Sequence, residues 1–244
     1  MKIIAHRGGN LGKENSLETM LLAANMGADA VECDIRKTKD GVYVIYHDEN
    51  LSRLAGTEAT VSSVTLKEMS ELLLKNDEKV MTFEELKRGY KSNTPILLHI
   101  KLMECDDEFA EYIANSQLPI IAGVMSINML KCFSKVLPKE RMLAFVPRPE
   151  DAEEFYKNGA GIIRLWEQWL KNITPDDVKK KCEDAEVYIM ACNVDSEPWE
   201  KMKLESMDGS YESLQKCYEL GADGVLLNNI ELAFDWQKHK GLHK

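Results

Sequence analysis

Apolar strand-like runs alternate with amphipathic helix-like segments through the second half of the chain, from Pro95 onward. Repeated strand-then-helix units are typical of parallel strands covered by helices. The strands predicted there are residues 96–102, 119–125, 142–146, 161–165, 187–192 and 224–227. The predicted helices are residues 107–116, 127–136, 149–158, 175–183, 211–220 and a last one beginning near Ile230. This rhythm predicts an α/β fold.

A β-hairpin is predicted in the first half. Residues 30–36 and 42–47 are rich in β-branched and aromatic side chains, and a short polar stretch ending in Asp40-Gly41 separates them. Asp-Gly between two such runs is a strong hairpin signal, and so short a connection requires antiparallel strands. With Asp40-Gly41 as a two-residue loop, Asp34 pairs with His47.

Glu32 lies on the same face of this hairpin as Asp34, because side chains alternate along a strand. Two carboxylates opposite an imidazole can hold a divalent cation and move a proton beside it. A solvated hairpin with chance charges is the simpler alternative, so the rest of the chain has to decide between them.

The number of strands indicates how the chain closes. With the amino-terminal strand that ends at His6, there are nine strand-like runs. If residues 42–47 only return above the barrel, eight parallel strands remain, each followed by a helix. We therefore predict an eightfold β/α (TIM) barrel with a β-hairpin above its mouth. The 244 residues and 44% apolar content suit one such barrel, so residues 1–244 are expected to form a single domain.

Local signals predict where helices begin. Asn15 with Glu18, Thr65 with Glu68, and Thr82 with Glu85 resemble capping boxes, and Thr174-Pro175 is a cap followed by a proline. Residues 49–64 are predicted to be a loop. Residues 196–209 are polar and are predicted to form an extended loop over the barrel mouth.

Polar side chains at predicted strand ends are the candidate functional residues. In β/α barrels the working residues lie at the carboxyl ends of strands. The candidates there are His6, Glu32, Asp34, His99 and Lys101, with His47 on the hairpin. Arg7, before Gly8 and Gly9, and Lys101 could bind phosphate, although each could instead be a rim residue paired with an acid or with solvent. His239 and His243 lie in a polar tail, where a solvated role is expected.

Charge and cysteine content limit the partners and the compartment. The formal net charge of -10 disfavours nucleic acid, and no apolar run approaches the length of a membrane helix. The six cysteines show no C-x-x-C pairing and no spacing typical of secreted proteins, so reduced core thiols are expected. The first residues run directly into a strand. We therefore expect a cytoplasmic protein with a small-molecule substrate and no membrane insertion, and the oligomeric state stays open.

Several ordered blocks resemble the glycerophosphodiester phosphodiesterase family. His6-Arg7-Gly8 is similar to the family's opening H-R-G, and Glu14-Asn15-Ser16 resembles its P-E-N-T block, with Lys13 where proline is usual. Residues 27–34, followed by 38–41 and 47–49, are close to its core signature. The resemblance continues through residues 51–66 and returns at 221–225, so that it spans nearly the whole chain.

The resemblance implies a barrel enzyme of lipid and glycerol metabolism that hydrolyses glycerophosphodiesters to an alcohol and sn-glycerol 3-phosphate. A divalent metal ion, magnesium or calcium by resemblance, would be held by Glu32 and Asp34. The other implied site residues are the general acid and base, the phosphate ligands and one orienting residue: His6 and His47, Arg7 and Lys101, and Glu14.

The chain departs from the family at the third metal ligand. The family's E-x-K strand carries a glutamate where this chain has His99. An imidazole can also ligate, but it favours manganese or zinc and removes one negative charge. Residues 190–194 and 227–229 also differ from the family, which suggests an altered leaving-group pocket that Trp166 and Trp169 could line.

Two alternatives follow from the same residues. One is a cyclising lyase similar to the phospholipase D toxins of spiders, which share the barrel, the two histidines and the E-x-D site. The missing disulfide pattern and secretion signal argue against it. The other is a non-catalytic barrel that binds phosphoesters, because His99 replaces the third acid.

Overall fold

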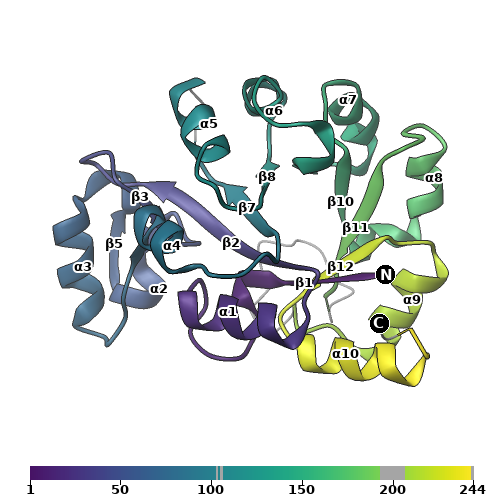
Figure 1. Ribbon diagram of the computed structural model, residues 1–244, viewed down its shortest axis with the longest axis horizontal. Coiled ribbons are helices and arrows are strands. Elements are labelled where there is room, and N and C mark those ends of the chain that lie inside the picture. Colours follow the sequence, from purple (N-terminus) through teal and green to yellow (C-terminus); the bar gives the residue numbers. More distant parts are fainter. Residues whose placement is uncertain (103, 105–106, 193–206, 243–244) are drawn as a thin grey trace.

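Eight parallel strands close into a barrel in the computed structural model, which describes residues 1–102, 104, 107–192 and 207–242 (Figure 1). The barrel strands are β1 (Lys2–Ala5), β2 (Ala30–Lys37), β7 (Ile96–Ile100), β8 (Ile120–Val124), β9 (Met142–Phe145), β10 (Ile162–Trp166), β11 (Glu186–Met190) and β12 (Gly224–Leu227). Strand β1 pairs in parallel with both β2 and β12, which closes the ring. The predicted eightfold β/α barrel is confirmed.

Helices surround the barrel strands (Figure 1). They are α1 (Leu17–Met26), α4 (Phe83–Gly89), α5 (Asp107–Ala114), α6 (Ile127–Phe133), α7 (Ala152–Lys157), α8 (Pro175–Lys179), α9 (Tyr211–Glu219) and α10 (Ile230–His239). Strand side chains alternate between two cores. In β10, Ile163 and Leu165 pack outward with the helices, whereas Ile162 packs inside the barrel with Leu143 and Tyr188.

The predicted helix starts are confirmed at three of four positions. Thr65, Thr82 and Thr174 each form a capping box. Helix α1 is capped by Ser16, whose hydroxyl accepts from the Thr19 amide at 3.2 Å, and not by Asn15. Asn15 has a left-handed φ of 55°. Its side-chain amide cannot cap α1, because both its NH₂ group and its oxygen form hydrogen bonds with Asp34.

The hairpin forms, but its register differs by one residue from the prediction. Strand β3 (Tyr43–Ile45) pairs antiparallel with β2, and Ile35 lies opposite Ile45. The loop has three residues, because the Thr38 amide donates to the Val42 carbonyl and the Thr38 hydroxyl accepts from the Val42 amide. Gly41, with φ 83°, supplies the left-handed residue that such a loop requires.

As a result of this register, Tyr46 and not His47 lies opposite Asp34, and the Tyr46 amide donates to the Asp34 carbonyl at 2.9 Å. The predicted pairing of Asp34 with His47 is therefore wrong. His47 lies beyond the end of β3, so the direction of its side chain is not set by the alternation of side chains along that strand.

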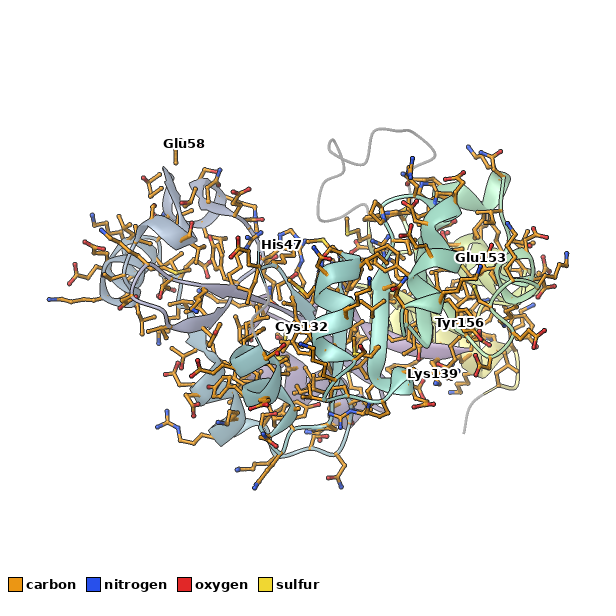
Figure 2. All side chains as sticks on the ribbon, turned by 90° about the horizontal axis from the view of Figure 1, so that it is seen from above. His47, Glu58, Cys132, Lys139, Glu153 and Tyr156 are labelled. Atoms are coloured by element: carbon orange, nitrogen blue, oxygen red, sulfur yellow. The ribbon has the colours of Figure 1, made fainter. Side chains whose placement is uncertain are left out.

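A lateral lobe, residues 43–82, extends from the carboxyl end of β2 to one side of the barrel (Figure 1). It contains β3, β4 (Asn50–Leu51), α2 (Ser52–Ala55), β5 (Thr57–Thr60), α3 (Leu66–Leu74) and β6 (Met81–Thr82). Its own apolar cluster includes Val44, Leu51 and Met69. The predicted loop at residues 49–64 is therefore wrong, because it folds into two short strands and a helix. Figure 2 shows His47 where this lobe, which carries Glu58, meets the barrel.

The remaining predictions concern cysteines, membrane spans and one loop. The described cysteines, at positions 33, 132, 182, 192 and 217, are buried and form no disulfide with one another, and Cys105 lies outside the described residues. Among the described helices, none combines the length and the apolarity that a membrane crossing needs. The loop predicted at residues 196–209 falls largely outside the described residues.

Candidate active site

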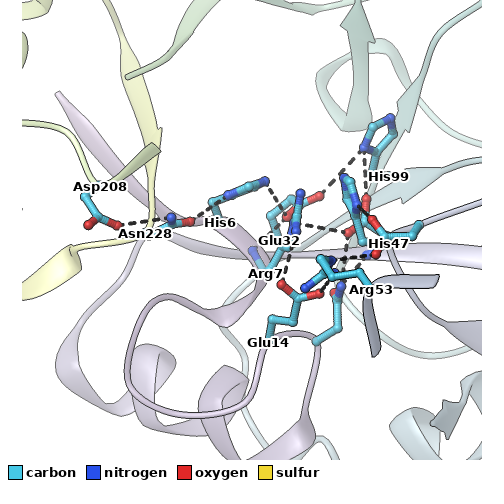
Figure 3. A network of polar contacts seen from close by, with 12 residues as sticks. His6, Arg7, Glu14, Glu32, His47, Arg53, His99, Asp208 and Asn228 are labelled. Carbon is cyan, nitrogen blue, oxygen red and sulfur yellow. Dashed lines mark hydrogen bonds and ion pairs between the residues drawn. The ribbon is translucent and has the colours of Figure 1, made fainter. Parts of the chain in front are cut away.

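Glu32 and Asp34, the third and fifth residues of β2, point into the barrel at the level where β1 ends, and both are buried. His99 joins them because Asp34 and His99 are partners in the parallel pairing of β2 with β7. The His99 Nδ1 atom lies 3.2 Å from Asp34 Oδ1 and 3.8 Å from Glu32 Oε1. The strand register thus gathers two carboxylates and one imidazole (Figure 3).

This trio fits a divalent metal ion. One ligand atom from each residue lies within 4.8 Å of the others. Asp34 Oδ1 is buried and makes no well-directed hydrogen bond within the described part of the chain, while His99 Nδ1 and Lys101 Nζ each lie 3.2 Å from it. Burial and then the neighbouring Asp34 carboxylate raise the pKa of Glu32 to about 8, which a cation between the two acids would relieve. Burial lowers the pKa of His99 to about 4, so its ring is neutral and can ligate.

Each acid is oriented by a group from the segment after β1. The Asn15 amide donates to Asp34 Oδ2 at 3.1 Å and accepts from the Asp34 backbone amide at 3.1 Å. The Arg7 backbone amide donates to Glu32 Oε2 at 2.8 Å. Sequence reasoning assigned Asn15 to helix capping and missed this role, although Asn15 stands in the Glu14-Asn15-Ser16 block.

His6 is buried at the end of β1 with its Nε2 atom 4.0 Å from Glu32 Oε2. Its Nδ1 atom lies 2.8 Å from Asn228 Oδ1. The Asn228 amide donates to Asp208 Oδ1 at 3.1 Å, which turns its oxygen toward His6. His6 therefore carries its proton on Nδ1 and presents an unprotonated Nε2 to the acid pair. Burial and then Arg7 hold its pKa well below the usual value. Sequence reasoning missed the roles of Asn228 and Asp208.

His47 lies at the same mouth despite the different hairpin register. Its backbone carbonyl accepts from Arg36 Nε at 2.9 Å and from Lys101 Nζ at 3.3 Å, which anchors it beside β7. Its Nδ1 atom lies 2.7 Å from Asp48 Oδ1. Because a carboxylate can only accept, Nδ1 carries a proton, and Nε2 is the ring nitrogen left to exchange a proton with a substrate. Burial lowers the pKa of His47, while Asp34 and Asp48 oppose that change.

Two cations, the buried Arg7 and the largely buried Lys101, complete the site. Lys101 Nζ lies 3.2 Å from Asp34 Oδ1, and Arg7 Nε lies 3.9 Å from Asp34 Oδ2. Glu14 pairs with Arg7 at 3.1 Å and also with Arg53, so that it orients the Arg7 guanidinium. Burial alone would raise the pKa of Asp34, but Lys101 and the nearby imidazoles hold it well below its usual value. The predicted site residues, from His6 to Lys101, are all brought together.

The His99 ring is held by an aromatic neighbour. It stacks on Phe145 with 3.9 Å between ring centroids. Gly123 makes room for Phe145, because a Cβ atom at position 123 would lie 2.4 Å from the ring. Trp166 packs against the inner core of the barrel, while Trp169 packs against the outer one. Of the two tryptophans predicted to line a pocket, only Trp166 therefore faces the barrel interior.

Comparison with known proteins identifies a matching family. The family model described as the glycerophosphoryl diester phosphodiesterase family matches residues 6–148, which is more than half of the 244 residues. The glycerophosphodiester phosphodiesterase of Caldanaerobacter subterraneus is 39% identical over 71 residues, covering 29% of each chain. For the first curated relatives, the match covers only 26% to 45% of the relative's length.

Solved structures are similar over almost the entire chain. The glycerophosphodiester phosphodiesterase of Thermotoga maritima has a TM-score of 0.71 at 22% identity, over 96% of both chains. A phosphodiesterase of Oleispira antarctica, in complex with the product sn-glycerol-3-phosphate, has a TM-score of 0.69 at 18% identity, over 96% of this chain and 97% of that one. At these identities the likeness supports the fold.

Proposed function

The chain belongs to the glycerophosphoryl diester phosphodiesterase family, and from this premise we propose that it hydrolyses glycerophosphodiesters to an alcohol and sn-glycerol 3-phosphate. One observation carries the proposal. Two imidazoles, His6 and His47, share a barrel mouth with an acid pair and two largely buried cations, and each imidazole is held at Nδ1, which leaves its Nε2 atom to exchange a proton. The product bound by the Oleispira antarctica phosphodiesterase supports the choice of product.

Arg7 and Lys101 are proposed to bind the phosphate. A phosphodiester resists attack because of its negative charge, so buried cations beside it favour reaction. Both side chains contact Asp34, which keeps their charged ends at the mouth. Glu14 holds the Arg7 guanidinium from the other side and is proposed to orient it for two parallel hydrogen bonds to phosphate oxygens.

His6 is proposed as the general base and His47 as the general acid. His6 pairs with a neutral amide and is buried, which favours its neutral, proton-accepting form. His47 pairs with the Asp48 carboxylate, which stabilises an imidazolium better than an amide does. His6 Nε2 would take a proton from the attacking hydroxyl, and His47, in its imidazolium form, would give its Nε2 proton to the leaving alcohol. Either water or the neighbouring glycerol hydroxyl could attack.

Glu32, Asp34 and His99 are proposed to hold the divalent metal ion. When bound, the ion would neutralise charge on the phosphate and on the acid pair. Magnesium or calcium is expected from the family resemblance. A ligand set that includes the His99 imidazole suits manganese or zinc better than a set of oxygen ligands alone.

The proposal is tested by turnover of glycerophosphocholine and glycerophosphoethanolamine with magnesium, calcium, manganese or zinc. Phosphorus NMR should show sn-glycerol 3-phosphate appearing as a free monoester. A cyclic phosphate as the end product would support the lyase instead. If the substrates bind but are not cleaved with any of the four metals, the result would support a non-catalytic phosphoester-binding barrel. That alternative is considered because His99 replaces an acid.

We also propose a cytoplasmic location. None of the five described cysteines forms a disulfide with another described cysteine, as is usual in a reducing compartment. Cell fractionation tests this, and recovery outside the cytoplasm would contradict it. In the cytoplasm, the proposed product sn-glycerol 3-phosphate would enter glycerol and lipid metabolism.

A further inference from the structure

Arg164 is a buried cation in the barrel interior that the proposed reaction does not use. It lies on β10 between Ile162 and Trp166, and its side chain is on the inner face that these residues share. Its guanidinium carbon lies 5.1 Å from the Phe145 ring centroid and 4.4 Å from that of Trp166. Phe145 in turn stacks on His99. Arg164 is therefore one aromatic ring away from the candidate metal ligands.

The Arg164 guanidinium has unused hydrogen-bond donors. The residue is 6% exposed, yet its Nε and Nη1 atoms have no hydrogen-bond partner among the described residues. Within the same residues no carboxylate forms an ion pair with it, although Glu32 is near enough to act on it electrostatically. Burial lowers its pKa to about 9. A buried guanidinium without hydrogen-bond acceptors raises the free energy of the folded protein. An acceptor with negative charge would offset that cost.

A second unused donor belongs to Gln168, which follows β10 and is 7% exposed. Its Oε1 atom accepts from the Cys192 thiol at 3.5 Å, while its Nε2 atom has no partner in the described structure. Cys192 also lies within electrostatic reach of Arg164. Arg164 and Gln168 are thus two buried donors without acceptors among the described residues, and Cys192 is a neighbour common to both. Such a lining fits an anionic group.

We propose that Arg164 and Gln168 form a subsite for a second anionic group, a carboxylate or a phosphate, on the alcohol portion of the phosphodiester substrate. The inference rests on the proposed function. The glycerol portion of a glycerophosphodiester carries no charge of its own, so the anion has to lie on the other alcohol. Arg164 suits this task because its planar fork matches the geometry of both groups.

The test uses two substrates of equal size, the sn-glycero-3-phospho esters of 3-hydroxypropanoic acid and 3-hydroxypropanamide. They differ only in a carboxylate against a neutral amide. We expect the wild type, with manganese present, to favour the carboxylate by about tenfold or more in kcat/KM and in Kd, as for a charge-assisted hydrogen bond. Arg164→Gln should abolish this preference and leave the amide substrate nearly unaffected.

Arg141→Gln is the matched control. Arg141 also has an unpartnered buried nitrogen, Nη2, but it precedes β9 at the opposite end of the barrel and donates to the Ile120 carbonyl. This variant should keep the preference for the carboxylate. Equal loss in both variants would overturn the proposal.

The wild type alone can also overturn the proposal, even if Arg164→Gln does not fold. Equal binding of the carboxylate and the amide by the wild type would contradict the subsite. If the carboxylate binds more tightly but neither ester is cleaved, the subsite stands and the proposed hydrolase activity fails.

Discussion

Asn228 Oδ1 lies 2.8 Å from His6 Nδ1, and the Asn228 amide faces the ring because its nitrogen donates to Asp208. The contact joins the last barrel strand to the first. It decides which nitrogen of His6 carries the proton, and so which one can accept a proton beside the acid pair. We infer that Asn228 positions His6, the proposed base.

Asn228→Ala should lower kcat by about 10-fold to 100-fold with little change in KM, because a hydrogen bond of about 1–3 kcal/mol that orients the base is lost. Asn229→Ala is the control. Among the described residues, the Asn229 side chain caps α10 by accepting from the Leu232 amide, so its loss should cost about 1 kcal/mol of stability without lowering kcat. Steady-state kinetics and urea unfolding measure both. An unchanged kcat in Asn228→Ala would contradict the positioning role.

Asn15→Gly should weaken metal binding by about 10-fold to 100-fold, as is usual when a residue that orients a ligand is removed. Glycine tolerates the left-handed φ of 55°, so this variant isolates the loss of the two bonds to Asp34. Asn15→Ala should bind metal as weakly and should also be less stable, because alanine strains the backbone there.

Calorimetric titration with manganese measures the affinity of the Asn15 variants. Ser16→Ala serves as the control, because Ser16 caps α1 and does not touch Asp34. Metal affinity in Asn15→Gly equal to that of the wild type would show that Asn15 has no part in the site.

The barrel could be predicted from sequence because its signals are local. Apolar runs and capping residues fix strands and helix starts within short windows, and all six strands predicted after Pro95 form close to the expected bounds. The hairpin register could not be fixed in this way. Asp-Gly suits both a two-residue and a three-residue loop, and the Thr38 hydroxyl, which bonds to the Val42 amide, favours the longer one.

The contacts that orient the site residues could not be predicted from short stretches of sequence. His6 and Asn228 are 222 positions apart, and no pattern in the sequence pairs them. Asn15 looked like a cap because asparagine before a helix usually is one. The side chains at strand ends were predictable, because barrel topology brings all such ends to one mouth.

His47→Ala should fold normally and lose turnover by about 10²-fold to 10⁴-fold, the range for removal of a general acid or base. The fold should survive because the side chain is 27% exposed, and the bonds from Arg36 and Lys101 reach the backbone carbonyl, which alanine keeps. Kinetics and circular dichroism check this.

A p-nitrophenyl leaving group tests which role His47 has. Such a group departs without protonation, so His47→Ala should lose much less activity with it than with a choline ester. Equal losses on both substrates would rule out the assignment of His47 as the acid.

His99→Glu should raise magnesium-dependent turnover. The expected increase is about tenfold or more, which is the size of effect usual for changes at a metal site. The change gives Glu32 and Asp34 a third carboxylate and converts a mixed set of ligands into an all-oxygen one, which magnesium prefers. Activity with zinc should fall at the same time. His99→Gln is the control, since it removes the imidazole without adding charge and should weaken activity with every metal. If magnesium-dependent activity does not rise in His99→Glu, position 99 does not set the metal preference.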